Sequence, residues 1–281
     1  MLGLLAGATQ KIRLGLGVTN PYTRNPALLA MSAATMDVLS GGRFLLGLGR
    51  SERESIEGEM GIHYGSPLGR LEESVKSLRR LFRGESVTNP ALGVKDITLK
   101  LRPRSGGVPI YLAASGPKAL RLAGRIADGV LLNAYSPVNY VHYAVSEINA
   151  GIKESGRGPR DVDVACVLIP RMTDDLPKVM GAMKKRIALL LTEPFTGQML
   201  LDKSGLEATF LSGLRKLMVK GETEASANLI PDELARAFYV AGSETECRKR
   251  IGEYRRAGIA LPVLLPQLSQ FGEVARRLWD A

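Results

Sequence analysis

The sequence predicts an α/β fold in which repeated β-α units build a parallel sheet. Short apolar runs alternate with longer helical patterns along nearly all of the 281-residue chain, and this alternation is typical of β-α units. The 31 glycines follow no collagen-like period, so they indicate many tight turns. A composition of 45% hydrophobic and 23% charged residues favours a folded globular chain over a disordered one.

Six apolar runs are expected to form the strands. Each is short and rich in Val, Ile and Leu, as buried parallel strands are. In chain order they cover residues 12–18, 43–49, 108–114, 129–133, 162–169 and 261–266. Six strands suit a doubly wound sheet, whereas a closed parallel barrel has eight, so the spacing alone leaves both architectures open.

Helical patterns fill most of the chain between these runs. They cover residues 27–39, 68–83, 117–126, 138–155, 174–191, 243–257 and 270–280. In the second of them, Leu71, Val75 and Leu78 recur on one face while Glu73 and Lys76 lie on the other, as expected for an amphipathic helix that covers a sheet.

Two segments depart from the alternation. Residues 85–107 are expected to form a loop with a short strand in the run ITLKL, and residues 192–232 are expected to add helices between two strands. Apolar residues persist through both segments, so neither is interpreted as a linker.

Composition narrows the class of protein. Lys and Arg exceed Asp and Glu by 38 − 28 = 10 charges, which favours an anionic ligand, a nucleic acid or simply solubility. Cys166 and Cys247 are the only cysteines, so the sequence encodes neither a disulfide framework nor a zinc cluster and suits a reducing cytoplasm. The chain contains no run of about 18 apolar residues, so a membrane span is not expected.

The first candidate site follows the first predicted strand, from Gly15 to Pro26. Glycines at the end of a strand let the backbone approach a flat ligand closely, and a polar loop after a strand lies at the catalytic end of a β/α barrel. The alternative is an ordinary strand-to-helix turn, in which Pro26 begins the helix.

The second candidate is the stretch from Gly47 to Glu52. It is not a dinucleotide-binding fingerprint, because Glu52 stands where the third glycine of that motif is needed. Glu52 is therefore interpreted as a proton donor or a substrate anchor beside Arg50. A surface ion pair between these two residues is the alternative.

The third candidate is the turn from Ala113 to Lys118. Ser115 is expected to cap a helix that begins at Pro117, and the free N–H groups of a helix start form an anion site. A capped helix start with no ligand is the alternative. Asn133, at the end of the next strand, is expected to reach the same ligand.

Several other residues are interpreted as structural. His63 and His142 are not spaced as metal ligands, and no metal site is expected. Asp128 is expected to be a turn residue. The basic clusters lie on helical faces without interleaved aromatic residues, so nucleic-acid binding is not expected.

Four stretches occur together and in one order: IRLGLGVTNPYTRNP, MDVLSGGRFLLGLGRSE, PIYLAASGPKALRLAGRIADGVLLN and AGSETECRKRIGEYRRAGIALPVLLP. In this combination the chain resembles the luciferase-like superfamily of flavin and deazaflavin oxidoreductases, especially the branch near the coenzyme F-420-dependent methylenetetrahydromethanopterin reductases. The resemblance covers essentially the whole chain. Each motif alone is weakly specific, whereas their order and joint occurrence are specific.

The resemblance implies a TIM-like (β/α)8 barrel as a single domain over residues 1–281. Members of the family have two further strands and helices before the first motif, so the chain is expected to lack the first two barrel strands, or roughly 50 residues at about 30 residues per unit. The helices of 192–232 are expected to be an insertion in this barrel.

The resemblance also implies roles for particular residues. The bond Gly17-Val18 matches a non-prolyl cis peptide that bulges against the ring of the cofactor. Glu52 matches the acidic position near the reacting centre, while Ser115 and Gly116 match the phosphate-binding turn. Asn133 matches a ligand position at the end of the next strand.

The loop after the second strand differs from the family. Arg50 and Ser51 replace the small, glycine-containing loop that is usual there, a departure that bears on substrate access.

The implied function is hydride transfer between coenzyme F-420, or a flavin, and a small organic substrate. The chain is expected to be a cytoplasmic homodimer that binds neither nucleic acid nor membrane. Two alternatives remain open: an FMN-dependent luciferase-like monooxygenase, and an inactive barrel fragment that acts as an assembly partner.

Overall fold

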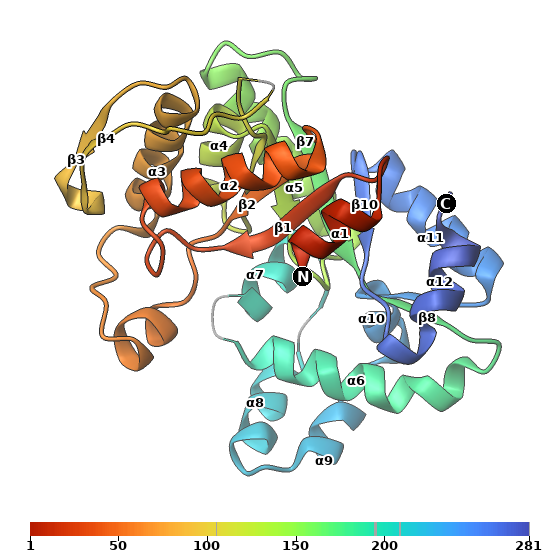
Figure 1. Cartoon of the computed structure of the whole chain (residues 1–281). Helices are drawn as coiled ribbons and strands as arrows, with labels where there is room; N and C mark the ends of the chain where they lie inside the picture. Colours follow the sequence, from red (N-terminus) through yellow and green to blue (C-terminus); the bar gives the residue numbers. More distant parts are fainter. Residues whose placement is uncertain (105, 194–195, 208, 281) are drawn as a thin grey trace. The chain divides into compact units, whose positions relative to one another are not determined.

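The computed structural model describes residues 1–104, 106–193, 196–207 and 209–280 (Figure 1). The chain forms two compact units. The first unit comprises Met1–Leu131 and Ile148–Val162, and the second comprises Leu132–Glu147 and Asp163–Ala281.

The first unit carries a parallel sheet and its covering helices. Its elements are α1 (Leu2–Ala8), β1 (Leu14–Thr19), α2 (Pro26–Ser40), β2 (Phe44–Leu48), a π-helical turn (Glu54–Glu59), α3 (Pro67–Phe82), β3 (Val87–Asn89), a 3-10 turn (Pro90–Leu92), β4 (Val94–Ile97), β5 (Ile110–Ala113), α4 (Pro117–Ile126) and β6 (Gly129–Leu132). Helix α5 (Val138–Glu154) begins in the second unit and ends in the first.

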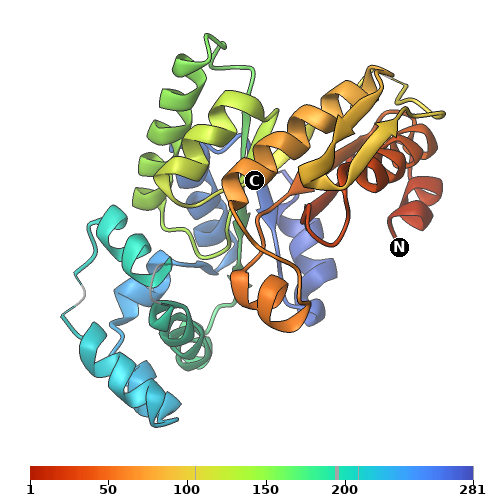
Figure 2. The ribbon, with the colours of Figure 1, turned by 90° about the vertical axis from the view of Figure 1, so that its left-hand side faces the viewer.

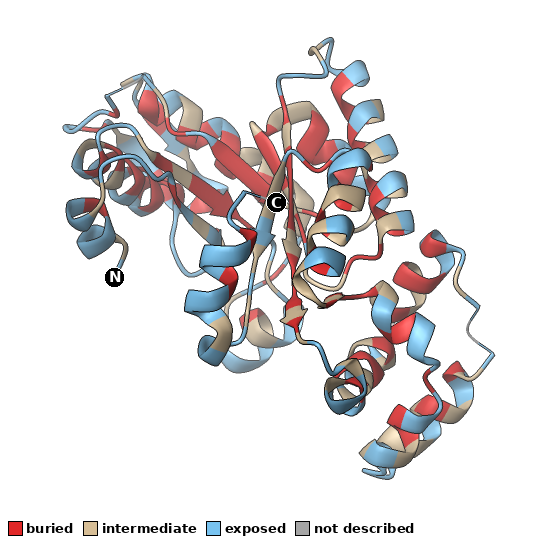
Figure 3. Cartoon of the chain, turned by 90° about the vertical axis from the view of Figure 1, so that its right-hand side faces the viewer, coloured by how far each residue is buried: buried red, intermediate tan, exposed pale blue. Residues whose placement is uncertain are grey.

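The sheet of the first unit has the strand order β1-β2-β5-β6, and all its pairs are parallel. Leu46 of β2 pairs with Ile110 of β5, and Leu112 of β5 pairs with Val130 of β6. All four side chains are buried. Figure 3 colours the chain by burial. Apolar residues thus fill successive strand positions because helices cover this parallel sheet.

Helix α3 confirms the predicted amphipathic pattern. Leu71, Val75 and Leu78 are buried against the rest of the unit. On the opposite face Lys76 forms an exposed ion pair with Glu73, 3.0 Å long. The buried face places α3 beside α2 and α4.

Asp128 lies in the turn between α4 and β6, as expected. Its carboxylate accepts hydrogen bonds from Arg79 of α3 (2.9 Å) and from the backbone N–H of Ile110 (2.8 Å). It therefore joins a helix to the amino-terminal end of β5, at the edge of the sheet opposite to the strand ends considered below.

The segment 85–107 differs from the prediction. Instead of a strand across ITLKL, it forms a short antiparallel hairpin, β3 with β4, that ends at Ile97 (Figure 2). Gly93 turns the chain between the strands with a φ of 66°, a conformation that glycine adopts without steric cost. The hairpin lies against α3.

The second unit contains short strands and most of the helices. Its elements are β7 (Asp163–Leu168), β8 (Pro170–Met172), α6 (Leu176–Thr192), α7 (Thr196–Ser204), α8 (Leu211–Val219), α9 (Thr223–Asn228), α10 (Asp232–Ala237), β9 (Val240–Gly242), α11 (Glu244–Arg256), β10 (Leu261–Leu264), a 3-10 turn (Leu268–Gln270) and α12 (Phe271–Leu278). Strand β7 pairs with β10 and β8 pairs with β9, both in parallel. The predicted extra helices of 192–232 are present as α7 to α10.

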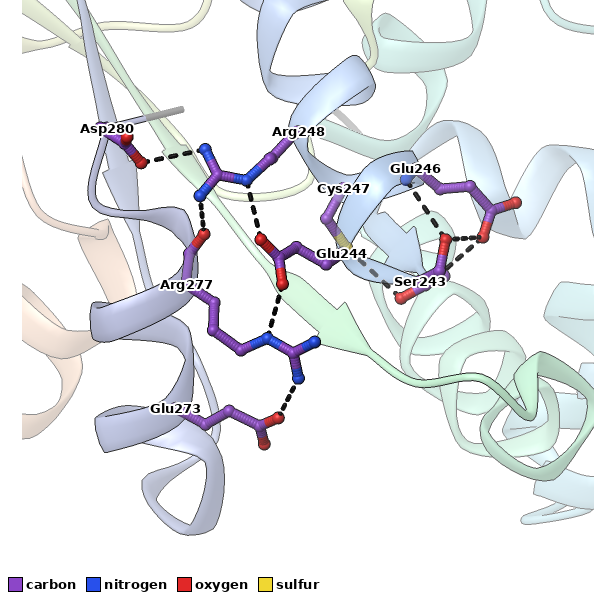
Figure 4. A network of polar contacts seen from close by, with 9 residues as sticks. Ser243, Glu244, Glu246, Cys247, Arg248, Glu273, Arg277 and Asp280 are labelled. Carbon is purple, nitrogen blue, oxygen red and sulfur yellow. Dashed lines mark hydrogen bonds and ion pairs between the residues drawn. The ribbon is translucent and has the colours of Figure 1, made fainter.

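Helices α11 and α12 are joined by a charged network (Figure 4). The Glu244 carboxylate accepts from Arg248 at 3.0 Å and from Arg277 at 2.6 Å. The hydrogen bonds from these two guanidinium groups lower the pKa of Glu244, and the larger effect comes from Arg277. Ser243 and Glu246 form a reciprocal capping box that begins α11.

Cys166 and Cys247 are free and buried. Among the described residues, no helix is long and apolar enough to cross a membrane. Over the same part of the chain, no group of three His, Cys, Asp or Glu residues is arranged to hold a metal ion.

Candidate active site

The predicted site residues of the first unit lie at one edge of its sheet. Parallel strands end at the same edge, and the ends of β1, β2 and β5 are neighbours there. Val18 belongs to the end of β1, Glu52 to the loop after β2, and Gly116 to the turn after β5. The structure therefore brings together residues that are up to 98 positions apart in the sequence.

The peptide bond Gly17-Val18 is cis, as the resemblance implied. It lies where the register of β1 against β2 shifts, between Leu16 and Thr19. Pairing resumes beyond the shift, because the N–H of Gly49 donates to the carbonyl of Thr19 at 2.8 Å. This bulge turns the Val18 side chain toward β2.

Two glycines of β2 and its end make room for the Val18 side chain. A Cβ atom at Gly47 would lie 2.8 Å from Val18 Cγ1, and one at Gly49 would lie 2.7 Å from Val18 Cγ2. The Cβ position of Gly49 is also 3.6 Å from the Cβ of Ala113, at the end of β5. Val18 remains 38% exposed. A small apolar surface, called here the shelf, thus lies open at the strand ends.

Glu52 is exposed in the loop after β2. Its backbone carbonyl accepts from the N–H of Ile56 at 3.1 Å, which begins the π-helical turn. The expected alternative, an ion pair with Arg50, is absent among the ion pairs of the described residues, and Arg50 instead donates to the Tyr64 hydroxyl at 3.2 Å.

The turn after β5 begins α4, but the cap differs from the prediction. The N-cap residue is Gly116, not Ser115, and no side chain caps the helix. A Cβ atom at Gly116 would meet no atom within 4 Å. The N–H groups of Lys118 and Ala119 precede the first helical bond, from Leu120 to Gly116, so this turn keeps donors and open space for an anion.

Asn133 lies in the second unit, directly after β6. It is exposed, and its backbone carbonyl accepts from the Ser136 hydroxyl at 2.8 Å. The predicted contact of its side chain with a ligand stays a prediction.

Two tyrosines join the loop after β1 to the loop after β2. The sequence did not indicate a role for this pair. The rings of Tyr22 and Tyr64 stack at 5.0 Å with an interplanar angle of 12°. The hydroxyl of Tyr22 donates to the carbonyl of Tyr64 at 2.8 Å. Burial raises the pKa of Tyr22 to about 12. The two tyrosines are 42 positions apart, so no local pattern in the sequence indicates that they pair.

His63 lies at the surface, as expected, with its Nδ1 3.3 Å from the Glu57 carboxylate. The same carboxylate accepts from the backbone N–H of Tyr64 at 2.8 Å and from Arg53 at 2.5 Å. These contacts lower the pKa of Glu57, and the largest effect comes from the hydrogen bond of the Tyr64 N–H. His63 therefore helps to shape the loop. His142 is also exposed.

The model of the family described as "Luciferase-like monooxygenase" matches residues 1–261. The chain is 36% identical over 259 residues to a 5,10-methylenetetrahydromethanopterin reductase of Methanolobus tindarius, covering 92% of this chain and 78% of that protein. It is 30% identical over 285 residues to a putative coenzyme F420-dependent oxidoreductase of Mycobacterium tuberculosis, covering 92% and 80%.

The solved structure of the coenzyme F420-dependent tetrahydromethanopterin reductase from Methanopyrus kandleri superposes on this chain with a TM-score of 0.81 at 28% identity. The match covers 95% of this chain and 80% of that one. The α/β fold with parallel strands is therefore shared with this structure. The chain belongs to the luciferase-like monooxygenase family.

Proposed function

We propose that this chain is an oxidoreductase that uses coenzyme F-420 to transfer hydride to or from a small organic substrate. The observation that carries the proposal is the exposed Val18 side chain, which the Gly17-Val18 bulge seats over Gly47 and Gly49 at the strand ends. The printed names of the relative at 30% identity and of the solved structure at 28% identity, both F420-dependent, support the choice of F-420 over FMN.

Different residues of the first unit would bind the ring and the phosphate of such a cofactor. Gly17 and Val18 offer an apolar surface to one face of the ring. Gly116 and the N–H groups of the first turn of α4 bind the phosphate, with Ser115 beside them. When bound, the deazaflavin supplies the hydride chemistry, while the protein binds and orients it.

Glu52 is the acidic residue of this site. Glu52 is exposed in the loop after β2 and is proposed as the general acid or base toward the substrate. Asn133 of the second unit is proposed as a further ligand contact. The finer architecture is also part of the proposal: a single-domain (β/α)8 barrel to which the described strands β1, β2, β5, β6, β7 and β10 belong, assembled as a homodimer.

The test is cofactor binding by the purified full chain. We expect saturable binding of F-420, read from the fluorescence of the deazaflavin, and weaker or no binding of FMN. Val18→Asp, which puts a charge on the apolar shelf, is expected to weaken F-420 binding, whereas Val263→Asp, at a half-exposed strand position of the second unit, is its control.

Retention of FMN with no affinity for F-420 would overturn the proposal in favour of a flavin-dependent monooxygenase. Binding of neither cofactor would favour a non-catalytic barrel that acts only in assembly. Sedimentation measurements at several concentrations separately test the homodimer.

A further inference from the structure

A cluster of two tyrosines and three arginines lies in the loops beyond the ends of β1 and β2. We call it the tyrosine–arginine cluster; its members are Tyr22, Arg50, Arg53, Tyr64 and Arg70. The guanidinium carbon of Arg53 lies 5.1 Å from the centre of the Tyr64 ring, and that of Arg70 lies 4.6 Å from the centre of the Tyr22 ring. The two stacked rings are thus flanked by a cation on either side.

The cluster is rigidly built. Both tyrosines are buried. The Tyr64 hydroxyl donates to the carbonyl of Ser51 at 2.8 Å and accepts from Arg50 at 3.2 Å. The Tyr64 hydroxyl thus links the Arg50 side chain to the backbone carbonyl of Ser51.

The three arginines differ in how their charge is balanced. Arg53 forms an ion pair with Glu57 at 2.5 Å. Arg70 donates through its Nε to the carbonyl of Pro21 at 3.0 Å. Arg50 is exposed, and within the part of the chain that the structure describes no carboxylate lies within 4.0 Å of it. Arg50 is thus the exposed arginine of this cluster whose charge is not paired with a carboxylate among the described residues.

Arg50 also stands at the right place for a reacting molecule. It directly follows Gly49, the residue at which an added Cβ atom would lie 2.7 Å from Val18 Cγ2. A ligand on the Val18 shelf would thus lie beside Gly49, the residue that precedes Arg50 in the chain. Guanidinium groups bind carboxylate and phosphate oxygens through paired, charge-assisted hydrogen bonds.

We propose that Arg50 binds an anionic group, a carboxylate or a phosphate, on the organic substrate, and so selects acidic substrates. This inference rests on the proposed function, because it assigns the substrate class of the same site. Tyr64 is the positioning residue that holds Arg50, through its hydroxyl.

The test compares Arg50→Gln with the matched control Arg53→Gln, in the full chain. Both residues are exposed arginines of one loop that contact Tyr64, but the charge of Arg53 is already paired with Glu57. Succinate and inorganic phosphate serve as probes, titrated calorimetrically at constant ionic strength, with and without F-420.

We expect saturable binding of at least one probe to the wild type. The loss of one charge-assisted contact is expected to weaken it about tenfold in Arg50→Gln and less than about twofold in Arg53→Gln. Arg50→Lys, which keeps the charge without the planar fork, should recover part of the affinity. Equal thermal midpoints of the variants show that the loop remains folded.

Three outcomes would overturn the assignment: no saturable binding by the wild type, unchanged binding in Arg50→Gln, or equal weakening in both variants. A fourth concerns the source of the anion. If Arg50→Gln weakens F-420 binding as much as it weakens succinate binding, Arg50 holds the acidic part of the cofactor and the substrate assignment is wrong. Failure of the wild type to bind F-420 refutes the proposed function, while the titrations of the cofactor-free protein still decide whether Arg50 is an anion site.

Discussion

Replacing Gly49 with alanine places a methyl carbon against the side chain that the cis bulge presents. The new Cβ would lie 2.7 Å from Val18 Cγ2, well inside van der Waals contact, whereas its other neighbours, the Ala113 and Val18 Cβ atoms, are at ordinary distances of 3.6 and 3.8 Å. The clash therefore involves one methyl group of Val18 and nothing else in the surroundings.

The expected cost follows from these contacts. Overpacking by one methyl group costs about 1–3 kcal/mol of unfolding free energy. Alanine at an unstrained glycine position regains about 0.4–1 kcal/mol by restricting the unfolded chain. The net loss for Gly49→Ala is therefore about 1–2 kcal/mol. Gly7→Ala is the matched control in α1, where a Cβ meets no atom within 4 Å, and it is expected to be neutral or slightly stabilising.

The assay is urea unfolding followed by circular dichroism, applied to a double-mutant cycle. Val18→Ala removes the clashing Cγ2 atom, so the double variant should be more stable than the sum of the single changes by about 1 kcal/mol or more. Gly47→Ala should not be rescued in this way, because its Cβ would lie 2.0 Å from the backbone oxygen of Leu16.

If the effects of Gly49→Ala and Val18→Ala on the free energy of unfolding are additive, the Val18 side chain does not pack against Gly49 as described. The same conclusion would follow if Val18→Ala rescued Gly47→Ala as well as Gly49→Ala, since only one of these two clashes is with a side chain alone. F-420 titration of the cycle members then shows whether the shelf that sets stability also binds the ring.

Three further predictions concern other parts of the chain. Burial raises the pKa of Cys166 to about 12 and that of Cys247 to about 11, so both thiols should stay unreactive toward a thiol reagent at pH 8 in the native protein and react once urea unfolds it; fast native labelling would contradict their burial. Tyr22→Phe removes a buried hydrogen bond and should cost about 0.5–1.5 kcal/mol in urea unfolding, and an unchanged midpoint would show that the two loops are not joined there. The lowered pKa of Glu244 means that its ion pairs stabilise the protein above the ordinary value of 4.5 and are lost as the pH falls through the folded value, so Glu244→Gln should be less stable than wild type at pH 7 and approach it near pH 3; a difference that persists in acid would exclude ion pairing as its cause.

The strands and most helices could be predicted from the sequence because their signals are local. All six expected strands are present as β1, β2, β5, β6, β7 and β10, shifted by at most two residues at their ends. Strands β8 and β9 were missed, since three-residue strands are too short to show a period. The hairpin of β3 and β4 was not predicted: its residues were expected to be loop, with a short strand at 97–101, because the turn at Gly93 depends on pairing between two segments.

The candidate site was predictable in part. The glycines within β1 and within and directly after β2 can be recognised in the sequence, since close backbone approach leaves few other residues possible. The cap of α4 was placed one residue too early, at Ser115 instead of Gly116, because both are acceptable cap residues and only the backbone path distinguishes them.

The sequence by itself determined which segments pair as β-α units, which family the chain resembles and which residues follow the strands. Only the tertiary structure decided that Val18 rests on Gly47 and Gly49, that Tyr22 stacks on Tyr64, and that Arg50 lacks a carboxylate neighbour among the described residues. The physical reason is that periodicity and turn chemistry act over a few residues, whereas packing and charge balance depend on atoms that the fold brings together from distant positions.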